Sequence, residues 1–476
     1  MKREGGRLFV RSARPGRVWT RVGTAKPLRD VWTPWPEGSR LVAEVGGRSL
    51  RLKHDSVPAP LAAPTTEPSL QHAAETALAR VAGNVGEPDG DTLALRAAVL
   101  ALDAATGDIL ACASLDRPGA DSRTEVSDPC VENSGIHPGS TFKLAVAAAA
   151  LGSDDPAVAS MVDGHLPAGL IRGGPRSGLE GARLPSLPLR SDSGRGRRLR
   201  SRLVNHRRRP MPVDTTLEDA LRSSSNTWFG YAGLLLHRPL REGWGGSGIA
   251  DAEGRREAWS VAGVVDAAGF GRRIDLGLGR TGTGGAFPAT AVEGDAAWAA
   301  RSIGQGDVTA TPLGIALLLA PAVSKGWVPV PRFSRDRPLE ARRVLDPEDA
   351  ERLREALHAV VRSGTARRAF SDHPRPELVL GKTGSAHRID GNGVPRTDAW
   401  FAGAVVPPDG VEGSPVVVVA VLPGAGLGGR SAAEVVDALS RDLIALRGWR
   451  SPIPAMDSVL TRPDLTSHAG AATFPQ

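Results

Sequence analysis

The chain of 476 residues is long enough for one large domain or for two or three smaller ones, and 41% of its residues are hydrophobic. Its net charge of +7 comes almost entirely from arginine, because only six of the 59 basic residues are lysine. A bias of this kind is typical of a GC-rich genome and does not by itself indicate a nucleic-acid partner. The two cysteines, Cys112 and Cys130, are too few for a disulfide scaffold or a cysteine-rich metal site. We expect no metal and no cofactor.

The N-terminal residues 1–57 alternate short strand-like runs with Gly and Pro, which predicts a small β-rich module of unassigned role. A linker rich in Pro and Ala begins the larger domain, which we expect to span residues 58–450, and we expect the tail 451–476 to be disordered. No signal peptide or transmembrane segment is recognisable, so the sequence as written predicts a soluble polypeptide.

In the larger domain, a helix is expected over Pro68–Val81, followed by the strands Arg96–Asp103 and Asp108–Ser114 joined as a hairpin. The order of elements predicts an α/β (α+β) fold with one five-stranded antiparallel sheet, flanking helices and an inserted helical subdomain. Further helices are expected at Thr141–Leu151, Leu217–Arg222, Ala258–Ala267, Pro312–Ser324, Pro347–Val361 and Ala432–Leu446, and further strands at Glu377–Gly381, Ala399–Val406 and Pro415–Leu422.

An insert over residues 173–212 is rich in Arg, Gly, Ser and Pro, and it is densest in arginine at 195–200 and 207–209. Such a run could bind an anionic polymer or lipid headgroups. We favour a flexible, solvated loop, because the whole chain is rich in arginine and the segment has few apolar residues.

The chemistry is expected to depend on Ser140 and Lys143, which stand at the start of the predicted helix that follows Pro138-Gly139. Residues three apart lie on one helical face, and the positive field of a helix N-terminus favours a developing anion on the serine. A neighbouring amine that can accept the proton would complete an activated nucleophile. The S-x-x-K pattern alone is weak, since it recurs by chance in long proteins.

Two further polar motifs follow in the same order along the chain. Ser224-Ser225-Asn226 comes directly after a predicted helix and is expected on a turn, and Lys382-Thr383-Gly384-Ser385 caps a predicted strand. Gly384 would let a ligand backbone lie against the strand edge. Between these motifs, Gly304-Gln305-Gly306 is interpreted as scaffold.

The order S-x-x-K, S-x-N, K-T-G resembles the penicillin-interacting serine acyl-transferases. The surrounding residues resemble the transpeptidase domain of high-molecular-mass penicillin-binding proteins over roughly residues 60 to 447. This resemblance implies a β-lactamase/transpeptidase-like fold. It rests on Pro138–Lys143, Ser224–Thr227, Gly304–Gly306 with Thr311–Leu313, Lys382–Ala386, Asp398–Phe401, Thr65-Thr66 with Leu70-Gln71, and Leu102–Ala111.

The resemblance implies a D,D-transpeptidase, in which Ser140 attacks a D-alanyl-D-alanine peptide bond and Lys143 accepts its proton. The enzyme would cross-link peptidoglycan stem peptides through an acyl-enzyme and would bind penicillin covalently. The other implied roles are the proton relay (Ser224), the hold on Lys143 and the substrate amide (Asn226), the anchor of the terminal carboxylate (Lys382, Thr383), and the oxyanion hole (the backbone N–H groups of Ser140 and Ser385).

The implied partners are peptidoglycan stem peptides, β-lactam antibiotics, and proteins of cell-wall synthesis or division, with no nucleic acid. The implied location is the extracytoplasmic face of the cytoplasmic membrane, although no anchor or export segment is present in the sequence. We therefore expect that a transmembrane helix has been lost from its N-terminal side. Two free thiols are the default for Cys112 and Cys130, but an oxidising location would permit a disulfide between them.

Three alternatives stay open from sequence. A serine β-lactamase or a D,D-carboxypeptidase shares the motifs, but a β-lactamase needs a deacylating base and no E-x-x-L-N follows the second motif. The motif separations of roughly 85 and 160 residues also suit the larger transpeptidases better. The third alternative is a β-lactam sensor or a non-catalytic penicillin-binding domain.

Overall fold

A computed structural model of the chain divides into two compact units, Met1–Ala62 and Ala63–Gln476. The structure describes residues 2–4, 7–10, 20–24, 40–46, 49–55, 64–83, 97–115, 128, 130–132, 135–166, 183–184, 187–192, 198–205, 211–212, 214–236, 260–288, 295–389 and 393–449.

In the first unit, every described residue belongs to a strand. Strands β1 (Lys2–Glu4), β2 (Arg7–Val10) and β3 (Thr20–Thr24) form an antiparallel sheet, and β4 (Arg40–Gly46) pairs with β5 (Ser49–Asp55). The assignment of 1–57 as a separate module stays a prediction, and the tail 451–476 lies outside the described residues.

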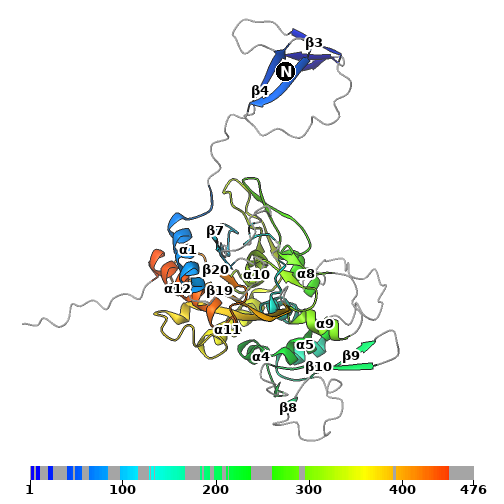
Figure 1. Cartoon of the computed structure of the whole chain (residues 1–476), viewed down its shortest axis with the longest axis vertical. Coiled ribbons are helices and arrows are strands. Elements are labelled where there is room, and N and C mark those ends of the chain that lie inside the picture. The colour runs from blue at the N-terminus through cyan, green and yellow to red at the C-terminus, as the bar shows by residue number, and fades with distance from the viewer. Residues whose placement is uncertain are drawn as a thin grey trace, which may run out of the picture. The chain divides into compact units, whose positions relative to one another are not determined.

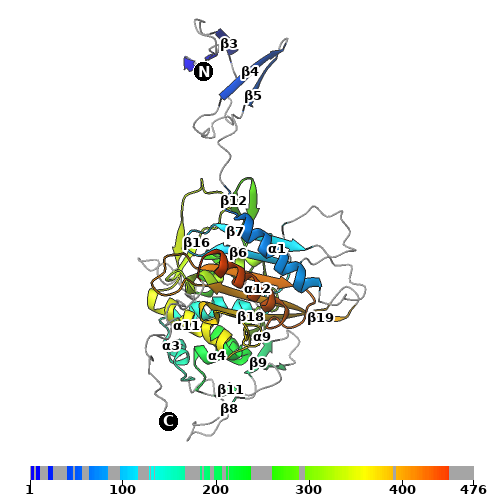
Figure 2. The ribbon, with the colours of Figure 1, turned by 90° about the vertical axis from the view of Figure 1, so that its left-hand side faces the viewer.

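The second unit is built on a five-stranded antiparallel sheet in the order β18-β19-β20-β6-β7, which is best seen in Figure 2. This architecture confirms the expected fold class. Strand β18 is longer than expected and extends through the whole Lys-Thr-Gly-Ser motif. The strands are β6 (Ala97–Asp103), β7 (Ile109–Leu115), β18 (Val379–Ile389), β19 (Pro395–Val405) and β20 (Val416–Leu422).

Helices cover both faces of this sheet. All seven residues of β20 are buried, which requires apolar partners on either side. Helices α1 (Pro68–Gly83) and α12 (Ser431–Leu446) pack on one face, and α10 (Pro312–Leu319) packs on the other (Figure 1). All eight residues of α10 are buried, which explains why its sequence is apolar on every side.

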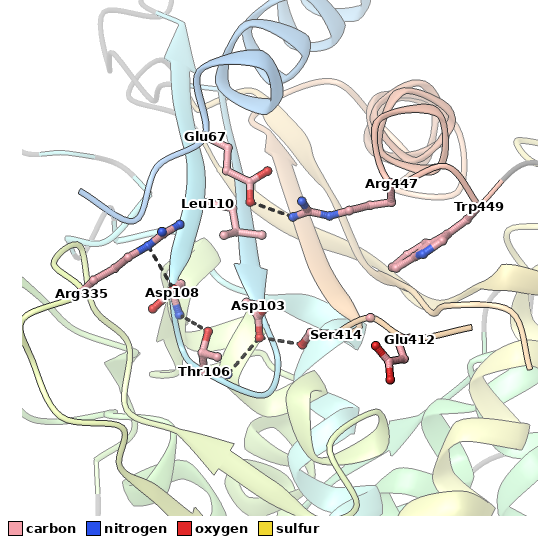
Figure 3. A pocket seen from close by; sticks show the side chains of 11 residues that line it. Glu67, Asp103, Thr106, Asp108, Leu110, Arg335, Glu412, Ser414, Arg447 and Trp449 are labelled. Carbon is pink, nitrogen blue, oxygen red and sulfur yellow. Dashed lines mark hydrogen bonds and ion pairs between the residues drawn. The ribbon is translucent and has the colours of Figure 1, made fainter. Parts of the chain in front are cut away.

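The turn that joins β6 to β7 borders a cavity of about 310 Å³ (Figure 3). The Asp103 carboxylate accepts hydrogen bonds from two backbone N–H groups of the turn, at Ala105 and Thr106, both at 2.9 Å. At the rim, Arg447 donates to Glu67 at 2.8 Å. None of the predicted site residues lines this cavity. The hairpin is bound at this place to the segment before β20, because Asp103 also accepts a hydrogen bond from Ser414 at 2.7 Å.

The segment between β7 and β18 contains the expected helical subdomain. Three helices were not expected from the sequence: α3 (Pro156–Val162), α5 (Asn226–Leu236) and α9 (Asp295–Ser302). Helix α5 begins at Asn226, inside the Ser-Ser-Asn motif, so no loop separates the motif from the helix. None of the described helices combines the length and hydropathy needed to cross a membrane. The helices of this segment are η1 (Gly139–Phe142), α2 (Lys143–Leu151), α3 (Pro156–Val162), α4 (Leu217–Ser223), α5 (Asn226–Leu236), α8 (Val261–Ala267), α9 (Asp295–Ser302), η4 (Ala320–Ala322), α11 (Pro347–Arg362) and η5 (Pro376–Leu378).

Short strand pairs complete the unit, and two of them lie in the arginine-rich insert. The expectation of a loop over residues 173–212 therefore differs from the structure. The run from 198 to 203 alternates charged or polar residues with leucine or serine, and this period of two favours a strand. The pairs are β8 (Arg183–Leu184) with β11 (Met211–Pro212), β9 (Leu187–Asp192) with β10 (Arg198–Leu203), β12 (Ile274–Gly277) with β13 (Arg280–Gly282), β14 (Gly285–Ala286) with β15 (Thr309–Ala310), and β16 (Trp327–Pro329) with β17 (Ala341–Arg343).

A buried carboxylate on β19 should contribute strongly to the stability of this unit. Asp398 is 1% exposed and accepts hydrogen bonds from Arg388 Nε at 3.1 Å and from the Gly424 backbone N–H at 2.8 Å. Replacing Asp398 by Ala removes the buried acceptor of the Arg388 and Gly424 hydrogen bonds and should lower the free energy of unfolding by about 3 kcal/mol, measured by urea denaturation.

The matched control is Asp163→Ala, which removes an ion pair with Arg352 whose two side chains are 60% and 50% exposed. This change should cost less than about 0.5 kcal/mol. Equal losses in the two variants would contradict the structural role assigned to Asp398.

Candidate active site

Ser140 is the second residue of the 3-10 turn η1, directly before helix α2. Gly304 helps to hold this turn, because its carbonyl accepts a hydrogen bond from the Gly139 backbone N–H at 3.0 Å. Gly139 and Gly304 both have positive φ, at 52° and 71°. A Cβ atom on Gly304 would lie 2.1 Å from the Gly139 carbonyl oxygen, so only glycine fits. This contact agrees with the interpretation of Gly304-Gln305-Gly306 as scaffold.

Lys143, one helical turn after Ser140, is completely buried at the start of α2. Its Nζ donates to Asn226 Oδ1 at 2.7 Å and to the Ser224 backbone carbonyl at 2.8 Å, and it lies 3.3 Å from Ser224 Oγ. The structure therefore joins the first and second predicted motifs directly. In the described part of the chain, no residue is hydrogen-bonded to the Ser140 side chain, and Ser140 is half-buried.

Ser224 occupies a special backbone position between two helices. It ends α4 in the left-handed region, with φ 55° and ψ 46°, and α5 begins two residues later at Asn226. A left-handed non-glycine residue is uncommon and costs about 1 kcal/mol or more. This backbone turn directs both the carbonyl and the hydroxyl of Ser224 to Lys143. The motif was expected on a turn, whereas only Ser224 and Ser225 lie there.

Lys382 approaches the same hydroxyl from the sheet. It is completely buried in β18, and its Nζ donates to Ser224 Oγ at 2.8 Å and to the Thr383 carbonyl at 2.9 Å. Ser224 Oγ therefore lies between two lysine amines. The Lys-Thr-Gly-Ser motif was expected at the end of a strand, but it lies in the middle of β18 because the strand continues to Ile389.

The two amines have no acidic partner among the described residues, although both lie in the interior. Burial lowers the pKa of Lys143 well below its usual value of 10.5, and the nearby charge of Lys382 lowers it further. Burial also lowers the pKa of Lys382, to about 7. Both shifts favour the neutral amine over the ammonium, compared with an exposed lysine.

Strand β18 is the edge strand of the sheet and brings the third motif against η1, the turn that carries Ser140 and is called the nucleophile turn. A Cβ on Gly384 would lie 2.8 Å from the Pro138 carbonyl oxygen, and one on Gly139 would lie 2.7 Å from the Ser385 carbonyl oxygen. These close backbone approaches place Ser385 beside Ser140. All eight predicted site residues thus lie on the nucleophile turn, the α4–α5 junction and β18.

Three residues that the sequence did not reveal hold the motifs in place. Thr365 Oγ1 lies 2.7 Å from Thr383 Oγ1, and the Gly428 backbone N–H donates to Ser385 Oγ at 3.1 Å. Asn205 Oδ1, at the end of the insert, accepts from Ser225 Oγ at 3.1 Å and from the Thr227 N–H at 3.0 Å. Because these residues are remote from the motifs in sequence, no local pattern could have identified them.

The insert makes a second contact with the site through its backbone. Asn226 Nδ2 donates to the Val204 carbonyl at 3.1 Å, while Asn226 Oδ1 accepts from Lys143. The orientation of this amide is thereby fixed from both ends. Among the described residues, the cluster that has metal-ligand side chains, Cys112, Asp128 and Cys130, includes none of the predicted site residues.

A five-stranded antiparallel sheet whose edge strand carries Lys-Thr-Gly-Ser, beside a serine, a buried lysine and a serine–asparagine turn, defines the penicillin-interacting serine transferase class. The family model for the penicillin binding protein transpeptidase domain matches residues 200–441. The chain belongs to this family. The matched residues include Ser224, Asn226 and the motif on β18, and they begin after Ser140 and Lys143.

Similar proteins agree with this assignment. Stage V sporulation protein D of Bacillus subtilis (strain 168) is 32% identical over 191 residues, which are 37% of this chain and 28% of that protein. The chain thus spans less than a third of the length of this curated relative. A chain of a peptidoglycan synthase complex that coordinates polymerization and crosslinking is 25% identical, with a TM-score of 0.53 over 83% of this chain and 64% of that chain.

Solved structures from Mycobacterium tuberculosis share the fold. Penicillin-binding protein A, solved as a ceftriaxone acyl-enzyme complex, has a TM-score of 0.53 and is 22% identical, over 80% of this chain and 79% of that chain. Penicillin binding protein 3 has a TM-score of 0.53 and is 20% identical, over 83% of this chain and 81% of that chain.

The lowered pKa of Lys382 predicts a pH dependence of stability. Between about pH 7 and 9, the unfolded chain keeps a proton on this lysine that the folded chain has lost, so stability rises with pH in this range. Lys382→Met abolishes this contribution. The free energy of unfolding of the wild type minus that of the variant should rise by about 1 kcal/mol per pH unit, measured by urea denaturation. If the difference in unfolding free energy between wild type and variant does not change with pH above pH 7, the pKa of Lys382 is not lowered in the folded protein.

Proposed function

We propose that this chain is a serine D,D-transpeptidase that cross-links peptidoglycan stem peptides through an acyl-enzyme and binds β-lactams covalently at the same serine. The observation that carries the proposal is the network Lys143–Ser224–Lys382, in which two buried amines contact one hydroxyl and have no acidic partner among the described residues. This network can accept a proton near neutral pH and return it.

In the acylation step, Ser140 Oγ attacks the carbonyl of the penultimate D-alanine and Lys143 accepts the hydroxyl proton. The two shortest contacts of Lys143 go to carbonyl oxygens, of Asn226 and Ser224, which can only accept. They use both N–H bonds of a neutral amine and leave its lone pair for the proton of Ser140. The pKa of Lys143 is lowered by burial and by Lys382, which supports this protonation state.

The leaving D-alanine then needs a proton on its nitrogen. Ser224 Oγ is 3.3 Å from Lys143 Nζ and 2.8 Å from Lys382 Nζ, so its hydroxyl can pass a proton from Lys143 to the leaving amine. The second half-reaction reverses this path: an amine of a neighbouring stem peptide loses a proton to the network and attacks the acyl-enzyme, which forms the cross-link.

The same backbone approaches that position the nucleophile would stabilise the reacting carbonyl. The N–H groups of Ser140 and Ser385 are proposed to form the oxyanion hole, because Gly139 lies directly against the Ser385 backbone. Thr383, held by Thr365, and the ammonium form of Lys382 are proposed to anchor the terminal carboxylate of the substrate. Gly384 allows the peptide to lie close to the strand.

The alternatives differ in what happens to the acyl-enzyme. A β-lactamase needs a base that activates water, and no carboxylate of the described residues is hydrogen-bonded to Ser140, Lys143 or Lys382. This supports a persistent β-lactam adduct. A D,D-carboxypeptidase differs only in using water as the acceptor, and a sensor would be acylated without cross-linking. For a transpeptidase the proposed location is outside the cytoplasmic membrane, in contact with proteins of cell-wall synthesis or division.

Covalent labelling tests the nucleophile. The purified protein incubated with fluorescent penicillin should retain the label after denaturation, and peptide mapping should place the adduct on Ser140. The label should be absent in Ser140→Ala, whose melting temperature should stay close to that of the wild type. Undiminished labelling of Ser140→Ala would refute the assignment.

A second test concerns the base. Guanidinium stays protonated at any working pH, so Lys143→Arg keeps a positive charge but cannot accept a proton. The second-order rate of β-lactam acylation should fall by about 10²- to 10⁴-fold, the usual contribution of a positioned base.

Lys325→Arg is the matched control, because it makes the same chemical change at an exposed lysine and should leave the rate unchanged. Melting temperatures of both variants separate loss of the base from loss of the fold. Acylation of a folded Lys143→Arg within about tenfold of the wild-type rate would exclude Lys143 as the base.

A further inference from the structure

Outside the active site, two cysteine side chains lie close together beside strands β6 and β7 of the central sheet. Cys112 lies on β7, and Cys130 lies in the segment that leads to the nucleophile turn. Both thiols are free in the structure, and the two sulfur atoms and a carboxylate oxygen of Asp128 all lie within 4.8 Å of one another. Cys130 is completely buried, whereas Cys112 is half-buried.

Asp128 holds this arrangement in place. One of its carboxylate oxygens accepts the Cys130 backbone N–H at 3.0 Å, and both oxygens lie 3.5 Å from Cys112 Sγ. Its backbone carbonyl accepts the N–H groups of Val131 and Glu132 at 3.1 and 2.8 Å. The resulting turn presses the Cys130 side chain onto the sheet beside Cys112.

A metal ion is a poor occupant for this cluster. Arg280 forms an ion pair with Asp128 and stacks on Phe333 at 3.7 Å from the ring centre, so a fixed positive charge already satisfies the carboxylate. Cys130 Sγ lies 3.5 and 3.4 Å from the carbonyl oxygens of Val99 and Ala113. These oxygens favour a neutral S–H and oppose the thiolate that a metal requires. A disulfide carries no charge and suits the same surroundings.

We propose that Cys112 and Cys130 are a disulfide site, which ties the segment before the nucleophile turn to strand β7. The oxidant is a disulfide of an exchange partner, either a protein or a small molecule. The Cys112 thiolate attacks one sulfur of that disulfide and releases one partner thiol. Cys130 then attacks the Cys112 sulfur, its proton passes to the departing thiolate, and a second partner thiol leaves. Two thiols are oxidised and one disulfide is reduced.

Burial gives the two thiols different parts in this sequence. Cys112 is half-buried and Cys130 is buried, so Cys112 is the thiol that an exchange partner can reach first. Burial and the neighbouring Cys112 also raise the pKa of Cys130, which disfavours its thiolate. Cys130 then reacts with a sulfur that is already its neighbour. The order of attack therefore follows from access, and the raised pKa of Cys130 agrees with it.

The bond would stabilise the approach to the active site. The Cys130 carbonyl accepts the N–H of Leu313 at the start of α10, and the Val131 carbonyl accepts that of Thr283. The Ile136 carbonyl accepts the N–H of Ala310 shortly before Ser140. A disulfide at Cys130 attaches the first residue of this series of backbone hydrogen bonds to strand β7. It also lowers the conformational entropy of the unfolded chain.

The test equilibrates the purified full chain with oxidised glutathione or with dithiothreitol, followed by denaturation and alkylation. The glutathione-treated wild type should contain no free thiol, and its digest should contain one peptide pair that is lighter by two hydrogen atoms and joins Cys112 to Cys130. The melting temperature should be higher than that of the reduced protein. In Cys112→Ser and in Cys130→Ser this difference should disappear.

Two other results would overturn the proposal. One is the recovery of two free thiols or of glutathione on each cysteine after oxidation. The other is one equivalent of zinc, added as the chloride, that protects both thiols from alkylation and resists dialysis. None of these readouts depends on acylation, so the disulfide and the proposed transpeptidase activity can fail independently.

Discussion

The contact of two buried amines with the Ser224 hydroxyl is the constraint on which the site depends. Lys143 and Lys382 come from a helix and from the sheet edge, and neither has a carboxylate partner among the described residues. Burying an unpaired charge is costly, so the pKa values of both amines are lowered. The apolar surroundings of α2 and the close packing of β18 therefore contribute to the chemistry of the site, because burial lowers the proton affinity of the Lys143 and Lys382 amines.

The backbone supports this arrangement with strained and closely packed positions. Ser224 adopts a left-handed conformation, and Gly139 and Gly304 meet at a distance that no side chain would allow. Such positions are unfavourable alone and persist where the surrounding structure fixes them. Their gathering around Ser140 indicates that the core of the unit offsets local strain at the site.

Much of this could be predicted from sequence. The five strands follow apolar runs of period two or continuous burial, and the three motifs are read from local residue patterns. Helix α5 was not predicted because only the turn at Ser224 separates it from the preceding helix. The strands of the insert were not predicted because its many arginines suggested a solvated loop. Thr365, Gly428 and Asn205 could not be foreseen, since each acts through a contact between segments far apart in the chain. Proximity of this kind is a property of the packed sheet.

The contact of Val204 and Asn205 with the Ser-Ser-Asn motif has a consequence for how such chains are recognised and engineered. The insert looks dispensable on a domain map, and a shortened gene lacking it would still spell out all three motifs. The Asn226 amide would nevertheless lose the carbonyl that orients it, and the Thr227 N–H would lose its acceptor. A motif search would score the shortened and the complete chain alike, although only the complete chain retains the scaffold of its second motif.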